Sequence, residues 1–360
     1  MISARQHAVA ISSLEQVILD PTMREKIPYF FDYFKGYVAT KRGIVSYFLQ
    51  SAVIAEHCQI QNRNVLDIGC GLGLRAICLA LLGARKVVGI DIAPEMVDGF
   101  AALLKEFPNL NIEVQKGDFL VNEYAPSSQD VVVLADAISH IRDTQLLLNK
   151  IEHVLSPGGH LYLLDGNNDM FLPGRIWRRK FWERCEHGPS AQGGDFHGRA
   201  VERLCFHDAR MEIIKSHQPF LDYQTLKTIA RRTQGMYGQE IVEAAAEYLN
   251  KGTISAKPSF PYRNPYTGEY PELGFNPFSL VKQLRKRRFD ANIVTPPLVQ
   301  VGITVGLSRP KSVVADLVCH LLKRFPRTLV PFFCPSFAIL ATKASNDAAS
   351  LKTSPSKCKT

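Results

Sequence analysis

Several signals of common protein classes are missing from this chain of 360 residues. Its eight cysteines form no Cys-x-x-Cys pair and lie at no zinc-finger spacing from histidines, so neither a zinc finger nor a dithiol redox site is expected. The N-terminal residues lack the long apolar core that a signal peptide has. The longest apolar run, residues 328–342, contains two prolines and is shorter than the roughly 20 residues of a membrane-spanning helix. We therefore predict a soluble cytoplasmic protein with reduced thiols and no transmembrane segment.

The composition is that of a globular protein with an excess of positive charge. Apolar residues make up 46% of the chain and charged residues 21%, which is compatible with a folded core. The formal net charge of +9 leaves room for an anionic partner, such as a nucleic acid, a phosphorylated substrate or an acidic membrane surface. Composition alone favours an ordinary basic protein that has no such partner.

The pattern of apolar residues divides the chain into segments. Residues 1–60 are predicted to be N-terminal helices, because their apolar positions recur at helical spacing. Short apolar strands then alternate with helices over residues 61–165, and this alternation indicates a parallel sheet covered on both faces. The strands are expected at residues 64–69, 86–91, 111–118, 129–137 and 160–166.

The rhythm changes after this core. Residues 166–270 contain predicted helices at 175–188, 222–235 and 239–252 and a glycine-rich loop at 190–199. We expect this insertion to fold over the open strand ends as a lid that binds the acceptor. Residues 271–343 should complete the sheet with two further strands, and the polar tail 344–360 is expected to be disordered.

The stretch VLDIGCGLG, residues 65–73, combines a buried strand with a glycine-rich turn before a helix. A dinucleotide fingerprint requires a glycine or alanine where Leu74 stands, so the spacing is G-x-G-x-G instead. Asp67 precedes the glycines, and a carboxylate there would repel a pyrophosphate. It would suit a ligand with a cationic end, which S-adenosylmethionine has in its ammonium and sulfonium groups.

Five ordered motifs resemble those of the class I S-adenosylmethionine-dependent methyltransferases: VLDIGCGLG, VVGIDIAPEM, GDF, LADAISHI and LSPGGHLYLLD. The resemblance implies a doubly wound, seven-stranded Rossmann-like sheet with a mostly helical lid insertion. It implies S-adenosylmethionine as the cofactor, with the glycines along its methionine and ribose, the second-strand acid on the ribose hydroxyls and the third motif at the adenine. The cofactor-binding residues implied in this way are Asp67, Gly69, Gly71, Gly73, Asp91, Ile92, Asp118, Phe119 and Asp136.

The fourth motif bears on the methyl acceptor. Its sequence ADAISHI contains neither the Asn/Asp-Pro-Pro-Tyr/Phe of enzymes that methylate exocyclic base nitrogens nor the cysteine of cytosine C5 enzymes. It looks like the motif of small-molecule methyltransferases of the ubiquinone and menaquinone type. In such proteins a histidine here borders the acceptor, so His140 is the candidate general base for a hydroxyl; a capping or packing role is the alternative.

A metal site is a further possibility that the sequence raises. Catechol-type O-methyltransferases hold magnesium with acids after the fourth and fifth strands, and Asp136, Asp165, Asn167 and Asn168 offer oxygens at similar places. The spacing departs from the Asp-Asn of that family by one residue, so we predict no metal. Asp165 and Asn167 are expected to line the acceptor pocket instead.

Two cationic segments leave the nature of the acceptor open. Residues 175–188 bring Arg175, Trp177, Arg178 and Arg179 together, either to bind an anionic or aromatic acceptor or as a solvated face. An apolar stripe over 313–325, flanked by lysines and arginines, either packs on the sheet or approaches a lipid-linked acceptor at a membrane surface. His187, His197 and His207 flank the glycine-rich loop without a recognised metal spacing.

The sequence thus predicts transfer of a methyl group to a small molecule, at oxygen. A tRNA or rRNA methyltransferase is the first alternative because of the net charge of +9, although the missing base-methylation motif argues against nucleic acid. A non-catalytic subunit with this fold is the second. Neither the acceptor nor the oligomeric state follows from the sequence.

Overall fold

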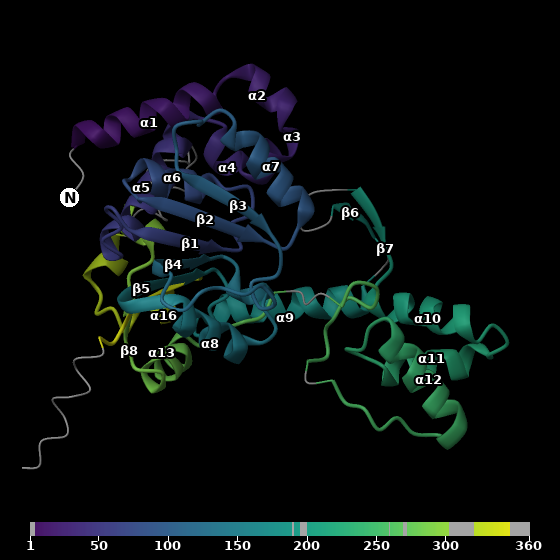
Figure 1. Cartoon of the computed structure of the whole chain (residues 1–360). Helices are drawn as coiled ribbons and strands as arrows, with labels where there is room; N and C mark the ends of the chain where they lie inside the picture. The colour runs from purple at the N-terminus through teal and green to yellow at the C-terminus, as the bar shows by residue number, and fades with distance from the viewer. Residues whose placement is uncertain are drawn as a thin grey trace, which may run out of the picture. The chain divides into compact units, whose positions relative to one another are not determined.

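The computed structural model describes residues 4–188, 191–194, 200–258, 260–268, 272–301 and 320–345 (Figure 1). The chain divides into two compact units. The first unit joins Met1–Phe171 to Phe275–Thr360, and the second is the insertion Leu172–Gly274. Most of the tail predicted to be disordered, and residues 313–319 of the apolar stripe, lie outside the described residues.

The first unit is built on a seven-stranded sheet with the order β3-β2-β1-β4-β5-β9-β8. β1 to β5 are all parallel, and β9 runs antiparallel to both β5 and β8. This confirms the predicted doubly wound, Rossmann-like fold class. The strands are β1 (Asn64–Ile68), β2 (Lys86–Asp91), β3 (Ile112–Lys116), β4 (Gln129–Ala135), β5 (Leu155–Asp165), β8 (Phe289–Val294) and β9 (Phe337–Lys343).

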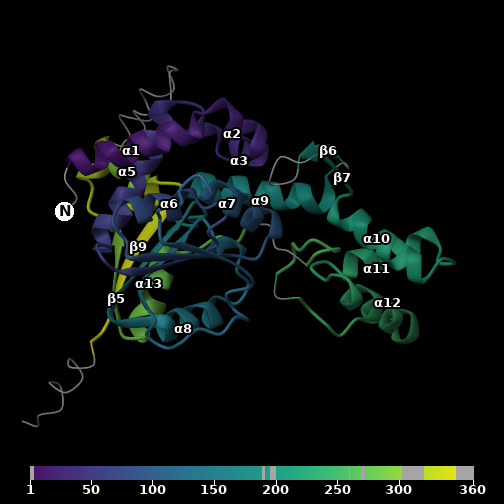
Figure 2. The same cartoon turned by 45° about the horizontal axis from the view of Figure 1, so that its top comes forward.

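Helices cover both faces of this sheet (Figures 1 and 2). Alternate residues of β1, β2, β4, β5 and β9 belong to two separate apolar clusters, because successive side chains point to opposite faces. One face packs against the N-terminal helices and against α5 (Lys41–His57), α6 (Leu74–Leu81) and α7 (Pro94–Leu104). The other face packs against α8 (Thr144–Val154) and α13 (Pro277–Lys286).

The N-terminal segment, expected to be helical, contains α1 (Ala4–Ile18), α2 (Pro21–Lys26), α3 (Pro28–Tyr33) and α4 (Lys35–Val38) before α5. Prolines start α2 and α3, where the first turn needs no backbone N–H donor. The aromatic rings of Phe34 and Tyr37 both contact Tyr47 of α5, with centroids 5.6 and 5.1 Å away. The short helices are thereby attached to the first unit by an aromatic cluster.

The insertion is mostly helical and has an apolar core of its own. It contains α9 (Leu172–His187), β6 (Ala191–Gly194), β7 (Ala200–Arg203), α10 (Phe206–His217), α11 (Tyr223–Arg232) and α12 (Gln239–Lys251). The prediction of a glycine-rich loop at 190–199 is wrong in part, because residues 191–194 form β6, which pairs antiparallel with β7. Glycines have low strand propensity, so backbone pairing here left no signal in the sequence. The predicted role of the insertion as a lid remains a prediction.

The insertion leaves and re-enters the first unit at one place. The backbone N–H of Asp169 donates to Phe275, and the N–H of Phe275 donates to Asn167, each at 2.8 Å. Behind this junction, Asn168 donates to the carbonyl oxygens of Pro331 and Cys334, beside α16 (Val330–Phe333). A short connection, residues 166–171, leads from the carboxyl end of β5 to the start of α9. In the part of the chain that the structure describes, no helix has the length and apolar character needed to cross a bilayer.

Candidate functional site

The three glycines between β1 and α6 have different structural roles. All have positive φ, at 68° for Gly69, 52° for Gly71 and 76° for Gly73. A Cβ on Gly69 would collide with Ala137, and one on Gly73 would overlap the ring of Phe100, so both glycines allow close packing. A Cβ on Gly71 would meet no atom within 4 Å. Gly71 is therefore the position where the loop backbone faces open space and a ligand can approach.

The carboxyl end of β2 is tied to this loop by Asp91. One carboxylate oxygen of Asp91 accepts the N–H of Gly71 at 2.8 Å, and the other accepts the N–H of Ala93 at 2.9 Å. Each oxygen keeps a second lone pair, so the carboxylate can still accept two hydroxyl groups. Ile92 follows with 68% of its surface exposed, an unusual position for an isoleucine and a suitable face for a flat ring.

Asp67 lies beneath the loop with only 3% of its surface exposed. Burial raises its pKa to about 7; the cation of Arg75 opposes this rise and the charge of Asp91 adds to it. Burial of a carboxylate is costly without a compensating charge. A cationic ligand above the glycine loop would supply this charge, which fits the ammonium group of S-adenosylmethionine.

Arg75 was not singled out from the sequence, although it lies in the first turn of the helix that follows the glycines. Its guanidinium lies 3.8 Å from the carboxylate of Asp136 and 5.5 Å from the ring centroid of Tyr47. Asp136 has a left-handed backbone with φ of 55°, which is uncommon outside glycine and clusters at functional sites. The Tyr47–Arg75–Asp136 set thus joins α5, α6 and the end of β4. In the sequence, only the position of Arg75 next to the glycines could have suggested that it belongs to the site.

The end of β3 carries the predicted adenine contacts. Asp118 accepts the N–H of Leu120 at 2.8 Å and so caps the turn after the strand. Phe119 is buried; its carbonyl oxygen accepts a hydrogen bond from Lys150 at 3.2 Å, and its ring packs on Tyr124 at 5.2 Å. Asp91 ends β2, Ile92 follows it and Asp118 follows the adjacent β3, so the three residues lie at one edge of the sheet. Their roles toward the cofactor remain predictions.

His140 lies on the short helix η1 (Ile138–His140) after β4, and its side chain is exposed. The backbone N–H of Ser139 donates to one oxygen of Asp165 at 3.2 Å, while the N–H of Asn167 donates to the other at 2.8 Å. Asp165 is fully buried, so the expectation that it lines a pocket is wrong: it holds η1 on the end of β5. Burial, together with the nearby charge of Asp136, raises the pKa of Asp165 to about 7 against these hydrogen bonds.

The oxygens that the sequence offers as possible metal ligands are occupied by other partners. Both oxygens of Asp165 accept backbone N–H groups, and the amide of Asn168 is directed to the 331–334 segment. Over the described ranges, no group of three or more histidine, cysteine, aspartate or glutamate side chains is placed to hold a metal ion. The candidate site is thus a cofactor-binding site at the carboxyl ends of β1, β2 and β3, with η1 next to it.

The basic helix of the insertion, α9, divides its cations between surface and interior. Arg178 is buried beside Trp182, whereas Arg175, Arg179 and Trp177 are exposed. Trp177 stacks on Phe181 with centroids 5.7 Å apart. Arg179 pairs with Glu183 of the same helix, so part of the positive charge on the exposed face is neutralised within α9. Whether it binds an acceptor remains a prediction.

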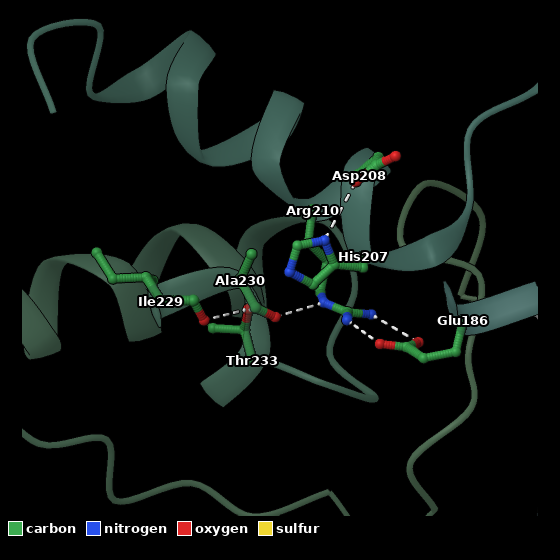
Figure 3. Close-up of polar contacts among 7 residues, drawn as sticks. All are labelled: Glu186, His207, Asp208, Arg210, Ile229, Ala230 and Thr233. Carbon is green, nitrogen blue, oxygen red and sulfur yellow. Dashed lines mark hydrogen bonds and ion pairs between the residues drawn. The ribbon is translucent and has the colours of Figure 1, made fainter. Parts of the chain in front are cut away.

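At its C-terminal end, α9 is fastened to the rest of the insertion by a buried ion pair (Figure 3). The carboxylate of Glu186 accepts two hydrogen bonds from Arg210 of α10, and the Nε of Arg210 donates to Ala230 of α11 at 2.8 Å. The rings of His187 and His207 lie 6.5 Å apart, and His197 is outside the described residues. These contacts organise the core of the insertion.

A seven-stranded sheet in which β9 runs antiparallel to its neighbours, with a glycine loop after β1, is the Rossmann-like arrangement of the class I methyltransferase type. Comparison with known families agrees. Residues 60–219 match the family described as a methyltransferase domain. This part of the chain is a class I S-adenosylmethionine-dependent methyltransferase domain, as the five motifs predict.

The relatives cover only parts of the chain. A ubiquinone biosynthesis O-methyltransferase from Xanthomonas campestris is 35% identical over 112 residues, which is 31% of this chain and 46% of the relative. Phosphoethanolamine N-methyltransferase 1 from Triticum aestivum is 29% identical over 151 residues, 42% of this chain and 30% of the relative. The chain thus spans less than half the length of these curated relatives.

Solved structures with a similar arrangement cover more of the chain at lower identity. The YcgJ protein from Bacillus subtilis covers 82% of this chain and 99% of its own length, with a TM-score of 0.43 and 12% identity. A methyltransferase from Methanosarcina mazei covers 82% of this chain and 98% of its own, with a TM-score of 0.41 and 18% identity.

Proposed function

We propose that this protein transfers the methyl group of S-adenosylmethionine to a small molecule, at a hydroxyl group. The observation that carries the proposal is the open space at Gly71, whose N–H is held by the Asp91 carboxylate, with the exposed Ile92 next to Asp91 in the chain. The residues fit the cofactor: acceptor oxygens for ribose hydroxyls, an apolar face for adenine and a buried carboxylate for the ammonium group. When bound, the cofactor supplies an activated methyl group on a sulfonium.

The remaining task of the protein is to orient the acceptor and to remove its proton. Holding two reactants in line supplies much of the acceleration in such a displacement, so no covalent step with the protein is needed. His140 is the proposed general base, since it is exposed on η1 and its helix is held by Asp165. The loss of a hydroxyl proton to an imidazole makes the acceptor oxygen a better nucleophile.

The choice of a small hydroxylic acceptor has two supports. The fourth motif contains none of the residues that base-methylating enzymes use. Relatives include ubiquinone biosynthesis O-methyltransferases, although phosphoethanolamine N-methyltransferase 1 also matches and makes nitrogen the competing acceptor atom. We place the activity in the cytoplasm, because the six cysteines that the structure describes are free thiols, as is typical of a reducing compartment.

Methyl-labelled S-adenosylmethionine incubated with the purified chain tests this function. The acceptor panel contains polar phenols and catechols, phosphoethanolamine and total RNA. Label in a phenol or catechol, reduced in Asp91→Ala at a limiting cofactor concentration, is the expected result. Label in phosphoethanolamine alone would replace oxygen by nitrogen as the acceptor atom, and label in RNA alone would overturn the small-molecule assignment. Tight cofactor binding without any transfer across the panel and cell extracts would favour a non-catalytic subunit.

A further inference from the structure

A cavity of about 350 Å³ lies in the first unit, away from the glycine loop. It is bounded by the end of α5, the residues after β8 and the segment 320–327. Its polar lining comes from His57, Thr295, Gln300, Lys323 and Arg327, and Phe325 forms part of an apolar wall. The methyl-transfer proposal uses none of these residues.

The described lining of the cavity carries positive charge. Among the residues that the structure describes, no carboxylate lines the cavity, and neither Lys323 nor Arg327 forms an ion pair. The pKa of His57 is lowered, first by burial and further by the charge of Arg327, while Glu56 opposes the shift. Cations that converge on one cavity are the usual basis for binding an oxyanion.

His57, which lines the cavity, and its neighbour Tyr162, which does not, both carry buried polar atoms that lack partners. The Nδ1 of His57 and the hydroxyl of Tyr162 have no hydrogen bond to any described residue, and their rings lie 5.7 Å apart. Buried polar atoms without a partner cost free energy until a ligand or a water supplies the bond. A ligand oxygen in the cavity, directly or through a bridging water, would satisfy the His57 nitrogen.

Next to the cations, residues 321–333 expose large apolar side chains. More than a third of the surface of each of these residues faces solvent: Leu321, Phe325, Leu329, Phe332 and Phe333. Phe325, which lines the cavity, packs edge-on against Phe333 with centroids 5.4 Å apart. Exposed apolar side chains that adjoin a cationic cavity match a molecule with an anionic head and an apolar chain.

The segment is fixed at the edge of the sheet where β5 ends. Val294, at the carboxyl end of β8, pairs with Ala338 of β9, and Ala338 pairs with Leu164 next to Asp165. Asn168 holds the 331–334 backbone by two hydrogen bonds. The segments around the cavity are therefore held in place by the sheet and by Asn168 of the first unit.

We propose that this cavity binds the oxyanion head of an amphiphile, a phosphate or carboxylate group, while the apolar chain lies along the exposed aromatic side chains of residues 321–333. Lys323 and Arg327 hold the anion, and His57 supplies a further nitrogen. The binding does not depend on methyl transfer.

Binding of dodecyl phosphate below its micelle concentration, measured by calorimetry, tests the proposal. We expect Lys323→Ser and Arg327→Ser each to weaken it about tenfold, since each removes a charge-assisted contact. Arg324→Ser is the matched control, because this exposed arginine lies on the same segment but does not line the cavity. Its effect should stay below about twofold. Inorganic phosphate and dodecyl maltoside, which carry only one half of the ligand, should both bind at least about tenfold more weakly than dodecyl phosphate.

Equal losses in all three variants would indicate general surface attraction and overturn the proposal, as would equal affinity for dodecyl maltoside. Vesicles of phosphatidylglycerol identify the source of the head group: binding that depends on Lys323 and Arg327 but not on Arg324 supports a membrane lipid, and selective binding of the free amphiphile supports a soluble ligand. Affinity for S-adenosylmethionine is measured in each variant and should be unchanged, so failure here is separable from failure of the methyl-transfer proposal.

Discussion

Glu186 and Arg210 form an ion pair that is closed to solvent, with side-chain exposures of 1% and 0%. The pair connects α9 to α10, and the third hydrogen bond of Arg210 extends the connection to Ala230 in α11 (Figure 3). These three helices are thus joined by polar contacts inside the apolar core of the insertion. A charge in such a place is tolerated only while its partner is present.

Arg210→Met should therefore destabilise the insertion by about 3–5 kcal/mol, because it leaves the carboxylate of Glu186 buried and unpaired. Hydrogen exchange of peptides from α9, α10 and α11 measures the effect locally. The double variant Arg210→Met with Glu186→Leu removes both charges and should regain a large part of the loss. Unchanged protection in the single variant would show that the pair does not hold these helices.

The packing role of Gly73 and the ligand-facing role of Gly71 can be separated by substitution. Gly73→Ala should lower the stability of the first unit by about 1–3 kcal/mol or more, because its Cβ overlaps the ring of Phe100. Gly71→Ala costs only the backbone strain of its positive φ, roughly 1–2 kcal/mol. Yet it should weaken S-adenosylmethionine at least about tenfold, since the methyl group enters the space of the ligand. Thermal unfolding and calorimetry measure the two effects, and full affinity in Gly71→Ala would place the ligand elsewhere.

The core sheet could be predicted because its signals are local. The buried runs of β1, β2 and β4 are short, apolar and separated by helices with clear ends, and the sheet order follows from the class that the motifs resemble. Asp91 and Ile92 were identified because a strand end fixes their direction. In contrast, α10 begins at Cys205 without a side-chain cap, and its weakly amphipathic sequence FHDARMEIIKSH left no helix prediction.

The interior contacts of the site could not be predicted from the sequence. Arg75 reaches Asp136, and Asp165 accepts from Ser139, across strands that only the fold brings together. Asp165 has the same sequence context as a pocket-lining acid, so its burial could not be inferred from its neighbours. The aromatic contacts of Tyr47 likewise depend on how the N-terminal helices pack.

Asp91→Ala should weaken S-adenosylmethionine about tenfold, because two charge-assisted hydrogen bonds to the ribose are lost. The same change also removes the bonds that hold the N–H groups of Gly71 and Ala93, so cofactor affinity and thermal stability are measured together. Asp98→Ala, at an exposed position on α7, is the matched control and should bind normally. Unaltered affinity in Asp91→Ala would remove this carboxylate from the ribose site.

Cofactor affinity should depend on pH through Asp67, whose pKa is raised to about 7 by burial. A cationic ligand favours the ionised carboxylate, so binding lowers this pKa and releases a proton below pH 7. Affinity is then greatest above pH 7 and falls as the pH drops, by at most about tenfold per pH unit. Asp67→Asn is the control in the same calorimetric titration. The ionisation of the ligand affects both proteins equally, so the difference between their pH profiles reports Asp67 alone. Identical pH profiles for the two proteins would exclude Asp67 as the group that titrates.

His140→Ala should lower turnover about a hundredfold or more and leave S-adenosylmethionine affinity within about twofold, because a general base acts on the acceptor alone. His153→Ala is the matched control, since His153 lies near the far end of α8 and contacts the carbonyl oxygen of Tyr124. A base role also requires that the loss be smaller for acceptors of lower pKa, which are already ionised. If the loss is the same for acidic and weakly acidic phenols, His140 orients the acceptor without taking its proton.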